Sequence, residues 1–264
     1  MHNFNFIRPT SVVEAVNAIA KAEDGQFMAG GQTVVPVLKQ RLAMPTDLID
    51  LVKIDGLKGI SLNNVDVAIG AMTTHAEVAR SNEIAKRIPA LSELAGMIGD
   101  PHVRNRGTIG GSIANNDPAA DYPAALVGLG ATVITDRRKI LADEFFKDLF
   151  ETALEDDELI TAVHFPIPER AAYMKFPNPA SRYAIVGVFL SQIGRDVRVA
   201  VTGAGPCVFR IEEMESALAA DFSPEVIDGM TISADDLNSD IHASAEYRAH
   251  LVSVMVRRAV AKAG

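Results

Sequence analysis

Two segments centred on glycine pairs constrain the fold of this chain more than any other feature. They are Ala29-Gly30-Gly31-Gln32-Thr33 and Thr108-Ile109-Gly110-Gly111-Ser112. Glycine has no Cβ, so it adopts positive φ angles and lets the backbone approach a ligand closely. Successive N–H groups can then point into one concavity, which suits an anion such as a pyrophosphate. Because no Lys or Arg lies between Gly30 and Lys39, amides and helix dipoles would have to balance that charge at the first segment.

Neither segment matches a common nucleotide-binding fingerprint. No G-x-G-x-x-G opens a helix, and no G-x-x-x-x-G-K-[ST] occurs. Gly203-Ala204-Gly205 is followed by Pro206 within a predicted hairpin region. A Rossmann domain is therefore disfavoured. Taken alone, Gly30-Gly31 is also compatible with a tight strand-to-helix turn that binds nothing, and the second segment is what favours a ligand.

Periodicity places the first segment between a strand and a helix. Residues 26–29 predict a short buried strand, and apolar residues then recur at helical spacing from about Thr33. Residues 47–51 predict another strand. From residue 60 to 69 the pattern changes to the alternation of a hairpin. We therefore expect a subdomain boundary near residue 56.

The rest of the chain predicts a mixture of helices and antiparallel strands. Helices are expected at 89–98, 124–129 and 243–262, strands at 131–135 and 159–165, and a hairpin over 183–202. Thr74-His75-Ala76-Glu77 has the pattern of a capping box at a helix start. Residues 104–123 carry several Gly, Asn and Pro residues with almost no periodicity, so this stretch is expected to be loop-rich.

Composition excludes several classes of function. The net charge is -9 and the basic clusters are short, so nucleic acid is an improbable partner. Cys207 is the single cysteine, which leaves no internal disulfide, iron–sulfur cluster or cysteine-rich zinc site. The histidines form no metal-binding pair at helical spacing. The apolar runs are shorter than the roughly 20 residues of a membrane helix and no leader opens the chain, so a cytoplasmic location is expected.

The glycine segments resemble a known family when they are taken together with Arg104-Asn105-Arg106-Gly107 and Asp117-Pro118-Ala119-Ala120-Asp121. The chain resembles the FAD-binding medium subunit of molybdenum hydroxylases of the carbon monoxide dehydrogenase and xanthine dehydrogenase type. The resemblance spans essentially the whole chain, including Asp157-Glu158-Leu159-Ile160 before Phe165-Pro166. It implies an α+β fold with two FAD-binding subdomains of PCMH type, residues 1–56 and 57–168. A C-terminal domain with a three-stranded antiparallel sheet and helices, residues 169–264, would follow.

The resemblance also implies which residues contact the cofactor. Both glycine segments would hold the pyrophosphate, and Asp121 would bond to the sugar-like part of FAD. Ile160 would pack beside the adenine or the flavin, Lys175 would lie near the flavin pyrimidine edge, and Tyr183 would lie close to the isoalloxazine. The full expected set is Ala29, Gly30, Gly31, Gln32, Thr33, Thr108, Gly110, Gly111, Ser112, Ala114, Asp117, Asp121, Ile160, Lys175 and Tyr183.

Three of these residues have simpler interpretations. Asp121 could be only a helix N-cap, Lys175 a solvated surface lysine and Tyr183 an ordinary strand aromatic. Two departures from the family pattern are informative. Many members have histidine where Gln32 stands, and glutamine cannot form a covalent flavin link, so FAD is expected to be non-covalent. The single Cys207 excludes the branch that binds an extra iron–sulfur cluster in this subunit.

The implied function is electron transfer within a larger complex. A large molybdopterin subunit would oxidise the substrate, 2Fe-2S clusters in a small subunit would relay electrons, and this chain would pass them to an external acceptor. A dimer of such heterotrimers is the expected assembly. No general acid, base or nucleophile constellation is recognisable, which fits a subunit that never touches the substrate. Two alternatives remain at this point, a self-contained FAD-dependent oxidoreductase and a non-catalytic accessory protein.

Overall fold

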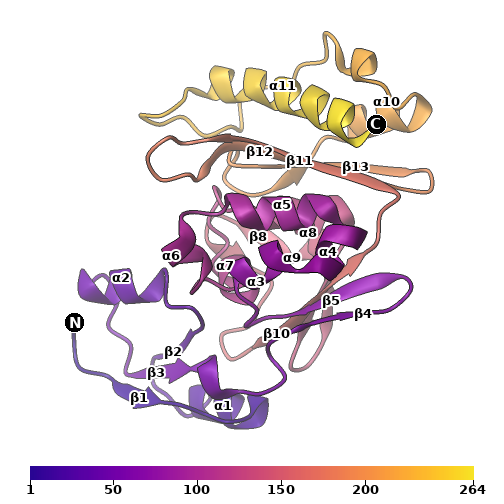
Figure 1. Cartoon of the computed structure of the whole chain (residues 1–264). Helices are drawn as coiled ribbons and strands as arrows, with labels where there is room; N and C mark the ends of the chain where they lie inside the picture. Colours follow the sequence, from indigo (N-terminus) through magenta and orange to yellow (C-terminus); the bar gives the residue numbers. More distant parts are fainter.

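The computed structural model describes residues 1–264, which form three successive units, each built around one main sheet (Figure 1). The middle unit also contains the two-stranded sheet β8-β9. The N-terminal unit has a parallel sheet in the order β1-β3-β2. Its elements are β1 (Asn5–Ile7), α1 (Val12–Ile19), β2 (Gly25–Met28), α2 (Val34–Lys39), β3 (Asp47–Asp50) and η1 (Leu51–Lys53). Ala15 and Ile19 of α1 pack on Ile49 of β3. The predicted strand, glycine turn, helix and strand are confirmed, with strand ends one residue from those expected.

The middle unit has an antiparallel sheet in the order β4-β5-β10-β6-β7, covered by short helices. The predicted hairpin and the capping box at Thr74 and Glu77 are confirmed. Its elements are β4 (Ile60–Leu62), β5 (Asp66–Gly70), α3 (His75–Arg80), α4 (Asn82–Arg87), α5 (Pro89–Met97), α6 (Pro101–Arg104), α7 (Ile109–Asn115), α8 (Tyr122–Leu129), β6 (Thr132–Thr135), β7 (Lys139–Leu141), α9 (Ala142–Phe145), β8 (Phe146–Asp148), β9 (Glu151–Thr152) and β10 (Ile160–Pro166).

The expectation that residues 104–123 are loop-rich is wrong for the centre of that stretch, where α7 forms. Its N-cap Thr108 accepts a hydrogen bond from the Gly111 amide at 3.1 Å. Ile109 and Ile113 lie one turn apart and are both fully buried, and this burial stabilises a helix that contains two glycines. A helix this short shows too little repeat for its period to be recognised in the sequence.

The C-terminal unit has a four-stranded antiparallel sheet, β11-β12-β13-β14, where the family resemblance implied three strands. The additional strand, β14, pairs with β13 only at Ala200 and Val201, and two residues show no alternation in the sequence. The elements of this unit are β11 (Arg170–Pro177), β12 (Ala184–Ile193), β13 (Asp196–Thr202), β14 (Phe209–Arg210), α10 (Glu212–Ala220), η2 (Pro224–Ile227) and α11 (Ala245–Ala263).

The C-terminal sheet lies between helices of two units. α11 packs on β11 and β12 from one side, and α8 of the middle unit packs on β12 and β13 from the other (Figure 1). Residues 184–190 of β12 are therefore all buried, which explains why they show no alternation of apolar and polar residues. Residues 181–183, in the turn between β11 and β12, line the same cavity as the second glycine segment.

Candidate functional site

A cavity of about 510 Å³ is lined by residues from all three units, and we call it the central cavity. Gln32 comes from the N-terminal unit, Ser112 from the middle unit and Tyr183 from the C-terminal unit. Every site residue expected from the sequence lines this cavity except Lys175. Its volume lies within the range of about 300–1,000 Å³ that is usual for cofactor sites.

The two glycine segments touch where they form the wall of the cavity. A Cβ on Gly30 would lie 2.0 Å from the Arg106 carbonyl oxygen, and a Cβ on Gly111 would lie 3.3 Å from the Ala29 Cβ. Gly31 has φ +73, in the left-handed region that favours glycine. Glycine is therefore required at position 30 by close backbone packing and at position 31 by backbone conformation.

The first segment provides free backbone donors. The amides of Gly30, Gly31, Gln32 and Thr33 donate to no acceptor in the protein, although all four residues line the cavity. Thr33 begins α2 without a side-chain cap, so the helix N-terminus also lacks a partner there. Unpaired N–H groups beside a helix N-terminus match an anionic ligand.

The second segment contributes differently from the expectation. Its Ile109, Gly110 and Gly111 amides already donate to Thr73 O, Ala71 O and Thr108 Oγ1. Gly110 is needed because a Cβ there would lie 2.6 Å from the Ala71 Cβ. In the second segment only the Thr108 amide donates to no acceptor in the protein, whereas four consecutive amides are free in the first. The second segment packs tightly and places Ser112 at the wall.

Asp121 belongs to a buried cluster that joins the middle and C-terminal units. Its carboxylate accepts a hydrogen bond from Tyr173 Oη and forms an ion pair of 2.8 Å with Lys175 Nζ. The side chain of Lys175 is 2% exposed, so it is not a solvated surface lysine. Burial raises the pKa of the Asp121 carboxyl, and the Lys175 ammonium acts in the opposite direction. Asp121 makes no side-chain cap of α8, so the capping interpretation does not describe its role.

The turn between β11 and β12 contributes Tyr183, which precedes β12 and is about half exposed at the cavity. Asp117 also lines the cavity, and its Oδ1 accepts a hydrogen bond from the Ala119 amide at 2.9 Å. Burial raises the pKa of the Asp117 carboxyl. Ile160, at the start of β10, is buried and contributes an apolar portion of the wall.

The loop before β10 is held by a bidentate ion pair. Glu158 accepts from Arg138 Nε at 2.8 Å and from Arg138 Nη2 at 2.6 Å, and also from the Glu155 amide. Hydrogen bonding from Arg138 lowers the pKa of Glu158 to about 2. Because Glu158 and Ile160 both line the cavity, this ion pair supports the wall directly.

Comparison with known proteins identifies the family. The model of the FAD binding domain in molybdopterin dehydrogenase matches residues 2–168, and the CO dehydrogenase flavoprotein C-terminal domain matches residues 171–263. The chain belongs to the FAD-binding medium subunits of molybdopterin-dependent dehydrogenases. It is therefore an oxidoreductase subunit with an FAD-binding domain.

Several medium subunits are similar over nearly their full lengths. The nicotine 6-hydroxylase medium subunit of Paenarthrobacter nicotinovorans is 36% identical over 98% of this chain and 96% of its own. The carbon monoxide dehydrogenase medium chain of Afipia carboxidovorans is 34% identical over 99% and 96%. A structure of carbon monoxide dehydrogenase from Hydrogenophaga pseudoflava, lacking the Mo-pyranopterin moiety, matches with a TM-score of 0.89 at 32% identity, covering 99% of this chain and 97% of that chain.

The residues of this medium subunit fit FAD. Four unpaired amides beside a helix N-terminus suit the pyrophosphate, and Ile160 and Tyr183 offer apolar and aromatic surface for a ring system. No group of three or more His, Cys, Asp or Glu side chains is placed to hold a metal ion. No helix combines the length and apolarity that crossing a membrane requires.

Sequence reasoning missed several polar residues of the cavity, among them His75 and Arg182. His75 Nδ1 is buried without a hydrogen-bond partner, and burial lowers the pKa of His75 to about 4, so the ring is neutral. In the sequence His75 sits inside a capping box, which signals only a helix start. Arg182 lies in the turn between β11 and β12 and has φ +64, and its Nη1 donates to Gly99 O at 3.3 Å. No sequence signal distinguished either residue.

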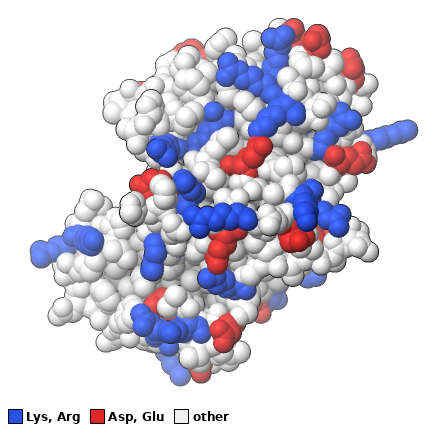
Figure 2. All heavy atoms as spheres, viewed as in Figure 1, with Lys and Arg blue, Asp and Glu red and all other residues white.

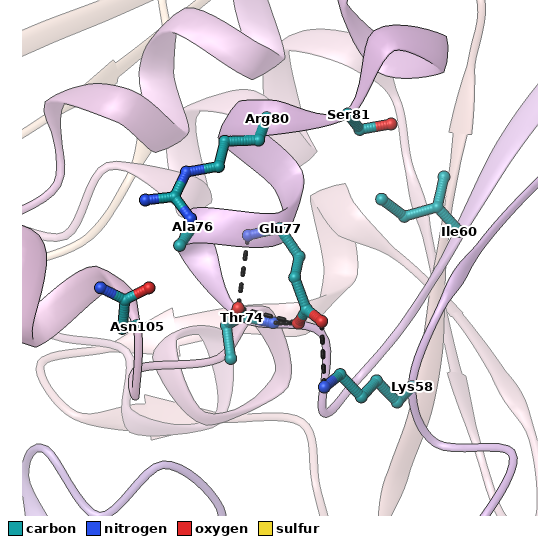
Figure 3. A pocket seen from close by; sticks show the side chains of 8 residues that line it. All are labelled: Lys58, Ile60, Thr74, Ala76, Glu77, Arg80, Ser81 and Asn105. Atoms are coloured by element: carbon teal, nitrogen blue, oxygen red, sulfur yellow. Dashed lines mark hydrogen bonds and ion pairs between the residues drawn. The ribbon is translucent and has the colours of Figure 1, made fainter.

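A second pocket of about 510 Å³ lies on the middle unit, and no residue of either glycine segment lines it (Figure 3). Its polar centre is Glu77, which bonds to Thr74 as the capping box of α3 and pairs with Lys58 at 2.9 Å. Helix capping explains these contacts without a ligand. On the face seen in Figure 2, basic and acidic side chains are interspersed.

Proposed function

We propose that this chain is the electron-transfer subunit of a heteromeric molybdenum hydroxylase. A small partner with 2Fe-2S clusters would deliver electrons that a large molybdopterin partner takes from the substrate. FAD, when bound, supplies the capacity to accept two electrons and to pass them to an external acceptor. The observation that carries the proposal is the central cavity, where two glycine segments meet and four amides have no partner.

The chain's own residues would bind and orient the cofactor. The amides of residues 30–33 would donate to the pyrophosphate, each hydrogen bond to a charged group contributing about 1.5–3 kcal/mol. Asp121, held by Lys175 and Tyr173, would accept from the hydroxyls of the sugar-like chain. Tyr183 and Ile160 would flank the rings. Because Gln32 has no imidazole, attachment of FAD would be non-covalent.

The assembly and location follow from the same proposal. Relatives are named as medium chains or subunits, and we extend this to an assembly with a large and a small chain, as a dimer of heterotrimers in the cytoplasm. The external acceptor would reach the flavin from solvent on the side of the cavity where Tyr183 lies, because this side chain is about half exposed.

Anaerobic reduction of the native complex tests the proposal. Substrate should bleach the iron–sulfur absorption of a complex that carries Gly30→Ala in this chain, but electrons should then fail to reach the external acceptor. The wild-type complex should pass them on. A single yellow chain that turns over an organic substrate without partners would instead establish a self-contained oxidoreductase.

A further inference from the structure

The C-terminal unit holds one wall of the central cavity through a set of hydrogen bonds to the loop at residues 117–121, which we call the 117–121 loop. The Gly203 amide donates to Pro118 O at 2.8 Å, and the Ala184 amide donates to Ala119 O at 3.2 Å. Thr202 Oγ1 lies 3.0 Å from Pro118 O and 2.6 Å from Ala120 O. The loop's two ends, Asp117 and Asp121, both line the cavity.

These contacts come from strand ends that are themselves fixed by α11. Arg248 is 4% exposed, and its Nη1 donates to Ile185 O at 2.7 Å and to Gly203 O at 2.9 Å. Its Nη2 donates to Asp240 at 2.8 Å. One buried guanidinium therefore joins the beginning of β12 to the end of β13, beside the amides that hold the 117–121 loop.

The backbone around Gly203, where the end of β13 meets the beginning of β12, is tightly packed. Gly203 has φ +83, and a Cβ there would lie 2.6 Å from the Ala184 carbonyl oxygen. Thr202 is 1% exposed, so no water competes for its hydroxyl. The three carbonyls of the 117–121 loop are consequently satisfied by the C-terminal unit rather than by solvent, and the loop is held in one conformation.

We propose that Thr202 and Arg248 are positioning residues that preorganise the 117–121 loop, so that the C-terminal unit controls how tightly this chain holds FAD. The inference rests on the proposed function. A loop already ordered before binding loses less conformational freedom when the ligand arrives, which increases affinity. Loosening the loop should therefore weaken FAD binding even though neither residue lines the cavity.

Ser191 provides a matched control in the same sheet. Its hydroxyl is fully buried and donates to Gly128 O at 2.6 Å, so it also joins β12 to the middle unit. Gly128 does not line the cavity. Ser191→Ala removes the same kind of bond as Thr202→Val across the same pair of units, but at a distance from the 117–121 loop.

FAD titration of the full-length apoprotein, followed by flavin fluorescence, tests the proposal. Thr202→Val should raise the Kd about tenfold, Thr202→Ser should restore it to within about twofold, and Ser191→Ala should change it less than about twofold. Equal weakening by Thr202→Val and Ser191→Ala would overturn the proposal in favour of general packing between the units. A wild-type chain that does not bind FAD would instead contradict the proposed function.

Hydrogen exchange on the wild-type chain gives a second test that needs no variant. Coupling between sites is reciprocal, so FAD should slow exchange of the Ala184 and Gly203 amides. The peptide covering residues 191–196, at the far end of the same hairpin, should be unaffected. Unchanged exchange at Ala184 and Gly203 on FAD binding would overturn the proposal even if Thr202→Val fails to fold.

Discussion

Gly30 illustrates how a single residue shapes the cavity wall. Its Cα approaches the Arg106 carbonyl so closely that an added Cβ would lie 2.0 Å from that oxygen. The neighbouring amides have no acceptor in the protein and are therefore available to a ligand. A methyl group at position 30 would separate the two glycine segments and displace these donors.

Gly30→Ala should therefore weaken FAD binding by at least about tenfold, since loss of one hydrogen bond to a charged group corresponds to about 1.5–3 kcal/mol. Gly96→Ala, in α5, is the matched control because a Cβ there meets nothing within 4 Å. It should leave binding unchanged and stabilise the helix slightly. Isothermal titration with FAD measures both, and wild-type affinity in Gly30→Ala would contradict the close-packing argument.

Glu158 should make the free energy of unfolding depend on pH in the acid range. Its pKa is about 2 in the folded chain and 4.5 ordinarily, so the Arg138 ion pair stabilises the fold above pH 4.5 and this contribution is lost as pH falls toward 2. Glu158→Gln should lower the free energy of unfolding by about 2 kcal/mol at pH 7, discounted for the half-exposed Arg138.

Urea unfolding of wild type and Glu158→Gln at several pH values measures this contribution. The difference between the two proteins should shrink steadily below pH 4.5. A difference that stays constant down to pH 2 would mean that the charge of Glu158 contributes nothing.

At the scale of residues, the sequence predicts which positions form the cavity better than it predicts what they do there. The glycine segments, Asp121 and Tyr183 are recognisable locally or through the family motifs. The partners of the second segment are not, because Ala71 and Thr73 lie far from Gly110 in the chain and only the tertiary fold brings their carbonyls to its amides. The surroundings of His75 and Lys175 are hidden from the sequence for the same reason, since both side chains are buried only in the tertiary fold.

At the scale of elements, β11 is joined to the loop before α8 by the Lys175–Asp121 ion pair. Burial and the Asp121 carboxylate raise the pKa of Tyr173 well above its ordinary value, so its phenol stays protonated and donates to Asp121. A buried ion pair of this kind contributes little net stability by itself, but removing one partner leaves an uncompensated charge.

Lys175→Met should destabilise the chain by about 3 kcal/mol at pH 7, because the buried Asp121 carboxylate must then stay unpaired or bind a proton. The double variant Asp121→Asn with Lys175→Met should recover a substantial part of that loss. Denaturant unfolding of the single and double variants gives the coupling free energy. Equal destabilisation of Lys175→Met and the double variant would exclude an unpaired charge as the cause.

Two of the elements that were not predicted share one property. α7 and β14 are short, and their stability comes from tertiary contacts rather than from periodicity or propensity. α7 forms because Ile109 and Ile113 are buried, and β14 forms by pairing with β13. Long elements such as α11 and the β12–β13 hairpin carry enough repeats to be recognised in the sequence alone.

At the scale of the whole molecule, three units meet at one cavity, and the chain offers no metal cluster of its own. The cavity walls hold unpaired amides, an aromatic side chain and a buried carboxylate whose charge is balanced by lysine. This arrangement suits the FAD of a medium subunit.

The most direct test of the account is whether the purified chain binds FAD, and how. Wild-type protein should bind one FAD per chain, and acid precipitation should leave all of the yellow colour in the supernatant, because Gln32 offers no imidazole for a covalent link. Absence of flavin binding would contradict the function proposed for the central cavity. Colour retained in the pellet would contradict non-covalent attachment.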